Sequence, residues 1–137
     1  MVGTAVAETR VAFVRSSGEH VEGPINEVDL GGVERALPVR KISSYPGQRN
    51  RPGLFWSATT RGHVPYESWL ELDRLLLADA GPEVTWIAAQ PMALTGLDGD
   101  TRRRHVPDLL LSRSGRRPLV VDVKDARRLD QRWLATR

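Results

Sequence analysis

The sequence predicts one domain of mixed α/β or α+β class, and three observations support this prediction. Its 137 residues are 40% hydrophobic and 27% charged, which is typical of a globular domain with one core. A single segment, residues 65–80, repeats apolar side chains at helical spacing. Short apolar runs, bounded by Gly, Pro or charged residues, indicate strands before and after it.

The N-terminal part, residues 1–53, is expected to be an extension with short strands. Two apolar runs indicate these strands: Arg10–Arg15 and Leu37–Ile42. Glycine and proline interrupt the residues between them, so Asn26–Ala36 predicts only loose helical turns. Ser43–Gly53 is polar and punctuated by Pro and Gly, which predicts a loop. Three of its residues are candidates for nucleic-acid contact: Tyr45, Arg49 and Arg51.

Residues 65–80 carry the start and stop signals of a helix. Pro65 suits the first helical position because its φ is fixed and it lacks an N–H. Gly81-Pro82 ends the pattern. Five apolar residues at helical spacing form a stripe that we expect to face the core: Tyr66, Trp69, Leu70, Leu76 and Leu77. The preceding run, Leu54–Thr60, has β-forming composition and predicts a strand.

Two glutamates of this helix lie off the stripe. Glu67, Glu71 and Arg74 are spaced to share one face. The helix dipole alone explains Glu67 in the first turn. Glu71 is compatible with a surface position, so the spacing alone assigns neither glutamate to a site.

The second half of the chain predicts a sheet. Glu83–Gln90 indicates a central strand, and Met92–Thr101 a turn region. Val106–Leu111 and Leu119–Val123 predict a hairpin of two buried strands. Ala126–Thr136 has the pattern of a last helix.

The predicted hairpin carries two carboxylates that its apolar runs do not explain, Asp108 and Asp122. Lys124 follows Asp122 by two residues, so the two side chains share a face of an extended strand, with Asp108 across from them. Two adjacent carboxylates repel each other unless one is protonated or a cation binds. Hard ions such as Mg²⁺ accept this kind of oxygen ligand. An ordinary surface pair of Asp122 and Lys124 is the alternative interpretation.

The charge of the chain is unevenly distributed. From Thr101 onward there are eleven Lys and Arg residues against four Asp and Glu, a net of +7. The net charge of the whole chain is +3, so the first 100 residues carry a net charge of −4. A basic half beside the carboxylates suits a phosphate-backbone partner, and a solvated basic face is the alternative.

Several classes of protein are excluded or unsupported. The sequence has no cysteine, which excludes disulfides, thiolate zinc sites and cysteine nucleophiles. It has neither a signal-peptide pattern nor an apolar run long enough to span a membrane, so we expect a soluble, cytoplasmic protein. It also lacks the motifs of P-loop nucleotide binding, serine hydrolases and zinc proteases.

Taken in order, Glu71 on the helix, Pro107-Asp108 and Asp122-Val123-Lys124 resemble the PD-(D/E)xK nuclease superfamily. Five segments in succession are similar to TnsA-like endonuclease subunits of heteromeric transposases: PVRKISSYPGQRNRPGLFWSATT, HVPYESWLE, VTWIAAQP, RRHVPDLLL and VVDVK. The resemblance covers Leu37 to the C-terminus. It implies a restriction-endonuclease-like core over residues 54–137, in which a helix is followed by a three-strand meander and another helix.

The resemblance implies a metal-dependent DNA endonuclease that cuts the 5′ ends of a transposon beside a separate transposase. Three residues match its metal ligands: Glu71, Asp108 and Asp122. One or two Mg²⁺ (or Mn²⁺) ions held there polarise the scissile phosphate and activate water. Lys124 matches the lysine that orients that water or stabilises developing charge. Glu67 is the rival of Glu71 for the helix position.

The resemblance also implies partners: double-stranded DNA and transposase and ATPase subunits. Two arginine clusters are expected to hold backbone phosphates: Arg102, Arg103 and Arg104, and Arg113, Arg116 and Arg117. His105 and Gln90 are possible accessory residues, for which a structural histidine and a capped strand end are the alternatives.

The chain departs from the family pattern at its C-terminal end. The nuclease core continues after the lysine with a full helix and a further strand, whereas this sequence stops at Arg137. We therefore expect a C-terminally truncated core, or one completed by homodimerisation through an open sheet edge. Two alternatives to an active transposase subunit remain: a catalytically silent DNA- or partner-binding module on the same fold, and a restriction- or repair-type nuclease.

Overall fold

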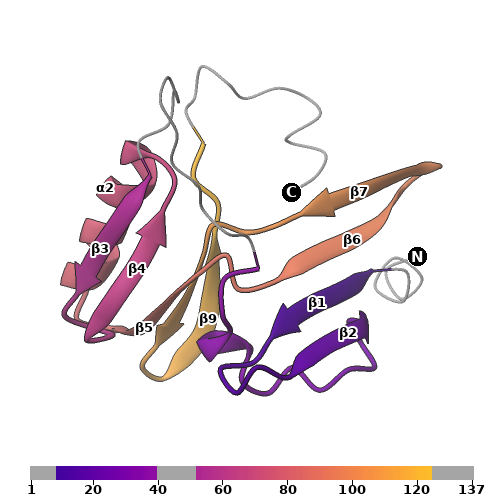
Figure 1. The fold of residues 1–137 in the computed structure, drawn as a ribbon, viewed down its shortest axis with the longest axis horizontal. Coiled ribbons are helices and arrows are strands. Elements are labelled where there is room, and N and C mark those ends of the chain that lie inside the picture. Colours follow the sequence, from indigo (N-terminus) through magenta and orange to yellow (C-terminus); the bar gives the residue numbers. More distant parts are fainter. Residues whose placement is uncertain (1–8, 40–51, 125–137) are drawn as a thin grey trace.

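A computed structural model describes residues 9–39 and 52–124, and its class is α+β (Figure 1). Strands dominate the described residues, with one α-helix and one short 3₁₀ helix among them. The elements follow in the order β1 (Arg10–Val14), β2 (His20–Pro24), η1 (Val33–Arg35), β3 (Gly53–Ser57), β4 (Gly62–Tyr66), α2 (Trp69–Ala80), β5 (Val84–Ala89), β6 (Ala93–Asp98), β7 (Thr101–His105), β8 (Leu109–Arg113) and β9 (Arg116–Val121).

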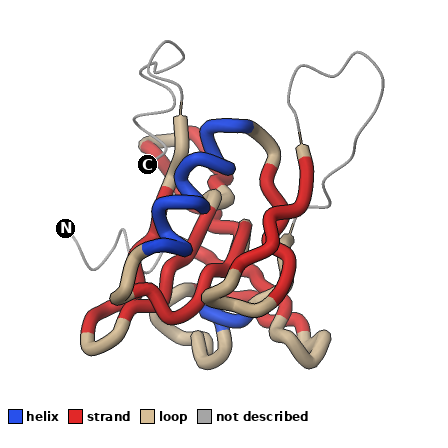
Figure 2. The backbone as a smooth tube through the Cα atoms, turned by 90° about the vertical axis from the view of Figure 1, so that its left-hand side faces the viewer, coloured by secondary structure: helices blue, strands red, loops and turns tan. Residues whose placement is uncertain are grey.

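The strands form three antiparallel sheets. One has the order β2-β1-β6-β7, one is the β3-β4 hairpin, and one has the order β5-β8-β9. The hairpin β6–β7 is inserted between β5 and β8, so the chain leaves the three-stranded sheet, builds half of the four-stranded sheet and returns. Figure 2 shows α2 along one side of the strands.

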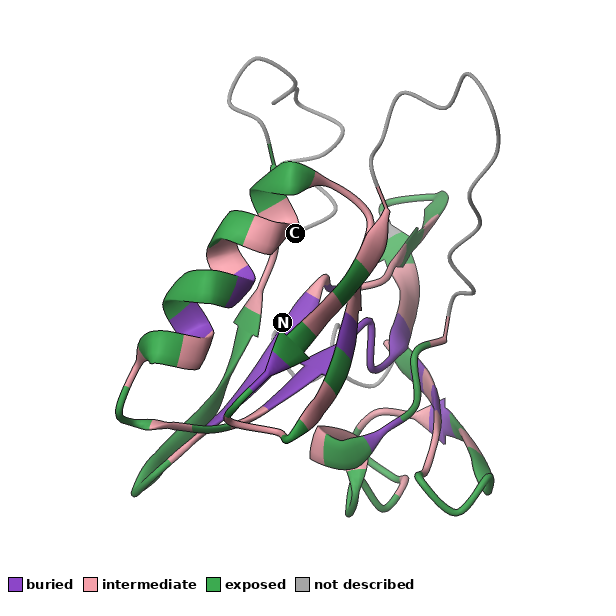
Figure 3. Ribbon diagram, turned by 60° about the vertical axis from the view of Figure 1, so that its left-hand side comes forward, coloured by how far each residue is buried: buried purple, intermediate pink, exposed green. Residues whose placement is uncertain are grey.

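Strand β8 and the second half of β5 are buried on both faces of the three-stranded sheet. Strand β9 is mostly exposed, so the prediction that both strands of the β8–β9 hairpin are buried is wrong for β9. On one face, Leu109 and Leu111 pack with Leu75 of α2 and Val64 of β4. On the other face, Leu110 packs with Val11 and Phe13 of β1 and with Ala36, which follows η1. Alternation along a strand sends neighbouring side chains to opposite faces, so the unbroken run Leu109–Leu111 serves both cores. Figure 3 shows these buried strands between the helix and the N-terminal layer.

The helix begins four residues later than its sequence pattern predicts. Pro65 and Tyr66 belong to β4, where Tyr66 pairs with Gly53, so the expected Pro65 start is wrong. The N-cap is Ser68, whose hydroxyl accepts a hydrogen bond from the backbone N of Glu71 at 3.3 Å. A serine at this position satisfies an N–H that the helix itself leaves unpaired.

The expected apolar stripe of the helix faces outward, which is a second correction. Trp69 is 64% exposed and Leu77 is 70% exposed, whereas Leu75 and Ala78 are buried. The contacts of Asp79 explain why α2 is rotated about its axis relative to the prediction. Its carboxylate accepts hydrogen bonds from the turn after β3, and this fixes which side of α2 packs against the sheet. Leucines lie on several sides of this helix, so the prediction of its buried face from the sequence pattern is wrong.

Two hairpin partners were not expected from the sequence. Strand β2 lies between the first two predicted strands, where no strand is predicted. Strand β6 lies within the predicted turn region Met92–Thr101, and β7 extends from the end of that region to His105. The run Thr101–His105 (TRRRH) has little β-forming composition. Its pairing with β6 is thus a tertiary effect, and a composition-based prediction misses it.

Part of the predictions falls outside the described residues. Of the expected strand Leu37–Ile42, the described part shows a bridge between Val14 and Leu37. The predicted loop over residues 43–51 lies outside the described residues, and with it the candidate nucleic-acid contacts Tyr45, Arg49 and Arg51. The predicted helix Ala126–Thr136 also lies outside them. Within residues 9–39 and 52–124, no helix has the length and apolar character needed to cross a membrane.

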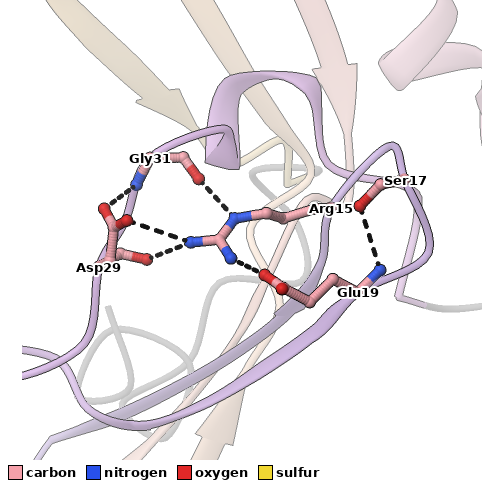
Figure 4. A network of polar contacts seen from close by, with 5 residues as sticks. All are labelled: Arg15, Ser17, Glu19, Asp29 and Gly31. Carbon is pink, nitrogen blue, oxygen red and sulfur yellow. Dashed lines mark hydrogen bonds and ion pairs between the residues drawn. The ribbon is translucent and has the colours of Figure 1, made fainter.

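Arg15 organises the N-terminal layer (Figure 4). Its guanidinium donates to the backbone O of Gly31 at 2.8 Å and of Asp29 at 2.9 Å, and it pairs with the Glu19 carboxylate. Asp29 in turn accepts from the backbone N of Gly31 at 2.9 Å. The arginine thereby ties the end of β1 to the segment that leads into η1, which packs against β5 through Arg35 stacked on Trp86.

Candidate functional site

The candidate site lies where β8 begins and β9 ends. These strands form a hairpin through a tight turn in which Gly115 has φ 68°, a conformation that favours glycine. In the register, Leu109 is opposite Val121 and Leu110 is opposite Val120. Continued by one residue past the strands, this register places Asp108 opposite Asp122. Both carboxylates therefore come to the same end of the sheet.

A cavity of about 350 Å³ opens at this end of the hairpin. Its lining combines two carboxylates, an imidazole and two cationic side chains: Arg104, His105, Val106, Asp108, Asp122, Val123 and Lys124. Asp122, Val123 and Lys124 follow directly after β9 and do not lie within it. The structure thus brings together three of the four predicted catalytic residues, Asp108, Asp122 and Lys124.

Asp108 is fixed by the chain segment it faces. Its Oδ2 accepts a hydrogen bond from the backbone N of Val123 at 2.7 Å. Hydrogen bonds to an ionised carboxylate are short and strong, so this contact holds the segment after β9 against the start of β8. Asp108 is half-buried, and the buried Pro107 precedes it.

Asp122 is fixed by a residue from the other sheet. Its Oδ1 lies 2.8 Å from Nε2 of His105, the last residue of β7. An ionised carboxylate can only accept, so His105 Nε2 is the donor. The Asp122 side chain is 10% exposed and that of His105 is 21% exposed. This contact joins the four-stranded sheet to the end of β9.

Gln90 continues the row of polar residues at the end of the sheet. Its backbone N donates to the Asp108 carbonyl at 2.9 Å, which places it beside Asp108, directly after the end of β5. Its φ is 46°, in the left-handed region that is uncommon for residues other than glycine. The Gln90 side chain is buried, and its Oε1 has no hydrogen-bond partner within the described residues. Such an atom is costly unless a ligand or water satisfies it.

Glu71 and Glu67 are at the start of α2 and are not among the residues that line the cavity. The Glu71 Oε2 accepts a hydrogen bond from the backbone N of Glu67 at 2.7 Å, and Ser68 accepts from the backbone N of Glu71. Ser68 and Glu71 therefore form a reciprocal cap of the helix start, close to a capping box. This contact gives Glu71 a structural role that does not depend on a metal.

Two carboxylates fit a hard cation. Mg²⁺ is commonly bound through one or two carboxylates together with water and substrate phosphate, and Asp108 and Asp122 provide such a pair at one cavity. Among the described residues, no group of three or more His, Cys, Asp or Glu side chains is placed to hold a metal ion.

The two arginine clusters are separated. Arg104 lines the cavity, and Arg102 and Arg103 precede it on β7. Arg113, Arg116 and Arg117 lie at the turn between β8 and β9, which is the opposite end of the hairpin from the carboxylates. That end is about five residues, or roughly 17 Å, from Asp108. Arg113 is also engaged there, donating to the Arg117 carbonyl.

Asp79 is the polar residue that the sequence did not single out. Its carboxylate accepts from Ser57 Oγ at 2.7 Å and from the backbone N atoms of Thr59 and Ala58. Burial of the carboxylate raises its pKa, but the hydrogen bonds together outweigh that effect and hold the pKa of Asp79 below its ordinary value of 3.8. The position of Asp79 in the last turn of α2 could have identified it from the sequence. A carboxylate near a helix C-terminus interacts unfavourably with the helix dipole, so it needs hydrogen-bond donors elsewhere.

No family model matches this chain, and no match is found among curated proteins or solved structures.

Proposed function

We propose that the protein is a metal-dependent DNA endonuclease subunit of a heteromeric transposase, with a core of the restriction-endonuclease type. The observation that carries the proposal is that Asp108 and Asp122, which flank the paired residues Leu109 and Val121, line one cavity together with Lys124. The order of α2, β5, β8 and β9 supports the resemblance, because the family implies a helix followed by a three-strand antiparallel meander. In this chain the β6–β7 hairpin is inserted between the first two of these strands.

Five residues that line the cavity have a role in the proposed reaction. Asp108 and Asp122 would hold Mg²⁺ or Mn²⁺, and the bound ion supplies Lewis acidity at the scissile phosphate. Lys124 places a positive charge beside the carboxylates, where it can hold a phosphoryl oxygen. The backbone N of Val123 and the His105 ring fix one oxygen of each carboxylate, so both ligands are oriented before a metal binds.

One observation favours the alternative of a catalytically silent DNA- or partner-binding module. Glu71, the third ligand that the resemblance implies, caps the helix start and does not line the cavity. A two-carboxylate site binds a cation more weakly than a three-carboxylate site, because fewer charged ligands offset dehydration of the ion. A restriction- or repair-type nuclease would use the same cavity and differ in its partners.

Plasmid nicking in Mg²⁺ or Mn²⁺ tests the proposal. We expect Asp108→Ala to lower the cleavage rate by at least about 100-fold, since it removes a metal ligand. Asp73→Ala is the matched control, because Asp73 is an exposed carboxylate on α2 outside the cavity. Lys124→Ala should lower the rate about 10²–10³-fold while the affinity for the metal is unchanged. Cleavage that survives Asp108→Ala would contradict the proposal, and metal binding without any cleavage would favour the silent module.

A further inference from the structure

The hairpin β6–β7 carries a basic face that the hydrolytic chemistry does not use. β7 is the edge strand of its sheet and has the sequence Thr-Arg-Arg-Arg-His. Side chains two apart on a strand share a face, so Arg102 and Arg104 lie on one face and both are exposed. Figure 1 shows this hairpin reaching outward from the centre of the molecule, with the end of β7 near the end of β9.

The strand pairing gives these two arginines uncharged partners. In the β6–β7 register, Arg102 is opposite Leu97 and Arg104 is opposite Thr95, so the cross-strand neighbours carry no charge. Within the described residues, neither Arg102 nor Arg104 forms an ion pair with a carboxylate. An exposed guanidinium on an edge strand can donate hydrogen bonds to an anion such as a phosphate.

The same face ends at the candidate site. Arg104 lines the cavity that contains Asp108 and Asp122, and Arg102 lies further out along the strand. Next in the chain, His105 is bonded to Asp122, which holds the end of the strand at the cavity. The arginines are therefore aligned on a path that leads from the exposed tip of the hairpin to the two carboxylates.

We propose that the face of β7 carrying Arg102 and Arg104 is the surface that holds duplex DNA, through its phosphate backbone, next to the cavity. The inference rests on the proposed function for its choice of DNA as partner, but it does not require catalysis. Asp100 is exposed at the tip of the hairpin, and a carboxylate there disfavours insertion of the tip into a groove lined by phosphates. The contacts are thus with the backbone and are independent of sequence.

The structure separates this surface from the other arginine cluster, which supplies a matched control. Arg116 and Arg117 are also exposed and adjacent, but they lie at the far end of the β8–β9 hairpin. Removing two charges from either place changes the net charge equally. A difference between the two pairs of substitutions therefore reports position and not charge.

The test is binding of a short fluorescent DNA duplex by anisotropy over a range of salt concentrations, in EDTA so that no cleavage occurs. For Arg102→Ala with Arg104→Ala, we expect the slope of log affinity against log salt to fall by about 0.9 per arginine. Arg116→Ala with Arg117→Ala should change the slope by less than half as much. Equal effects of the two pairs, or no effect of the first, would overturn the proposal.

Lysine variants distinguish phosphate contact from base recognition. Arg102→Lys with Arg104→Lys should restore most of the affinity, because a point charge is sufficient for a phosphate, whereas bidentate recognition of a base requires arginine. A loss equal to that of the alanine variants would overturn the backbone assignment. If Arg102→Ala with Arg104→Ala weakens DNA binding but the native protein never cleaves DNA, the nuclease is refuted and this surface is retained. If the native protein cleaves DNA and the two substitutions do not change DNA binding, the nuclease is retained and this surface is refuted.

Discussion

The acidic residues of this protein differ in what surrounds each carboxylate. Asp79 accepts several hydrogen bonds from the turn after β3. Asp108 and Asp122 accept from Val123 and His105 respectively and line the cavity. The first residue therefore stabilises the fold, whereas the other two are oriented around a space that a ligand can enter.

Asp79→Asn should destabilise the protein by about 1–3 kcal/mol near neutral pH, because it removes a charged acceptor from the Ser57–Thr59 turn. The pKa of Asp79 is lower in the folded state than its ordinary value of 3.8. Its contribution is therefore fully present above that value and is lost as the pH falls through the folded pKa. Urea denaturation of both proteins at about pH 7 and about pH 3 measures this, and the difference should shrink at the lower pH. An unchanged difference would mean that Asp79 acts without its charge.

Glu71 allows stability and chemistry to be separated. Glutamine can still accept the hydrogen bond from the backbone N of Glu67, so Glu71→Gln should change the free energy of unfolding by less than about 0.5 kcal/mol, while Glu71→Ala should cost about 1 kcal/mol. If Glu71 also completes the metal site, Glu71→Gln should lower Mg²⁺-dependent cleavage at least about tenfold. Full cleavage by the glutamine variant would restrict Glu71 to its capping role.

At the scale of elements, α2 has apolar residues on several faces, and its packing against the sheet determines which face is buried. Its sequence offers a stripe through Trp69 and Leu77, but the sheet and the β3–β4 hairpin bury the side with Leu75 and Ala78. The contacts of Asp79 with the turn after β3 fix that rotation. The period of a helix is thus readable from sequence, whereas the buried face depends on contacts with segments distant in the chain.

This orientation predicts unequal costs for two similar substitutions in α2. Leu75→Ala should destabilise the protein by about 2–5 kcal/mol, because Leu75 has no exposed surface and the substitution leaves a cavity. Leu77→Ala should change the free energy of unfolding by no more than about 0.5 kcal/mol, since Leu77 is 70% exposed. Urea denaturation compares the two variants directly. Equal losses would show that the outer face of α2 is covered in solution.

The sequence predicts local features of the fold better than its distant pairings. The strands around Arg10–Val14 and Val84–Ala89 and the β8–β9 hairpin follow from apolar runs and turn residues. The pairing of β6 with β1 and of β7 with β6 does not, because TRRRH lacks a β-forming pattern. For the same reason, the pattern could place Asp108 near Asp122 across a short hairpin, but not His105, which reaches Asp122 from another sheet.

At the scale of the whole molecule, two sheets meet at the candidate site. The three-stranded sheet supplies Asp108 and Asp122, and the four-stranded sheet supplies Arg104 and His105. Within the described residues, the fold places the arginines after Thr101 in two groups, one on β7 beside the carboxylates and one at the distant turn of the β8–β9 hairpin. The net charge of the sequence alone does not distinguish these two places.

The central claim is that Asp108 and Asp122 form one site for a divalent cation. Calorimetric titration of Mn²⁺ into the native protein and into Asp108→Ala tests it most directly, with Asp73→Ala as the exposed-carboxylate control. We predict binding by the native protein and the control, and none by Asp108→Ala, because a single carboxylate is left at the cavity. Identical binding by all three proteins, or no binding by any of them even with duplex DNA present, would contradict the account.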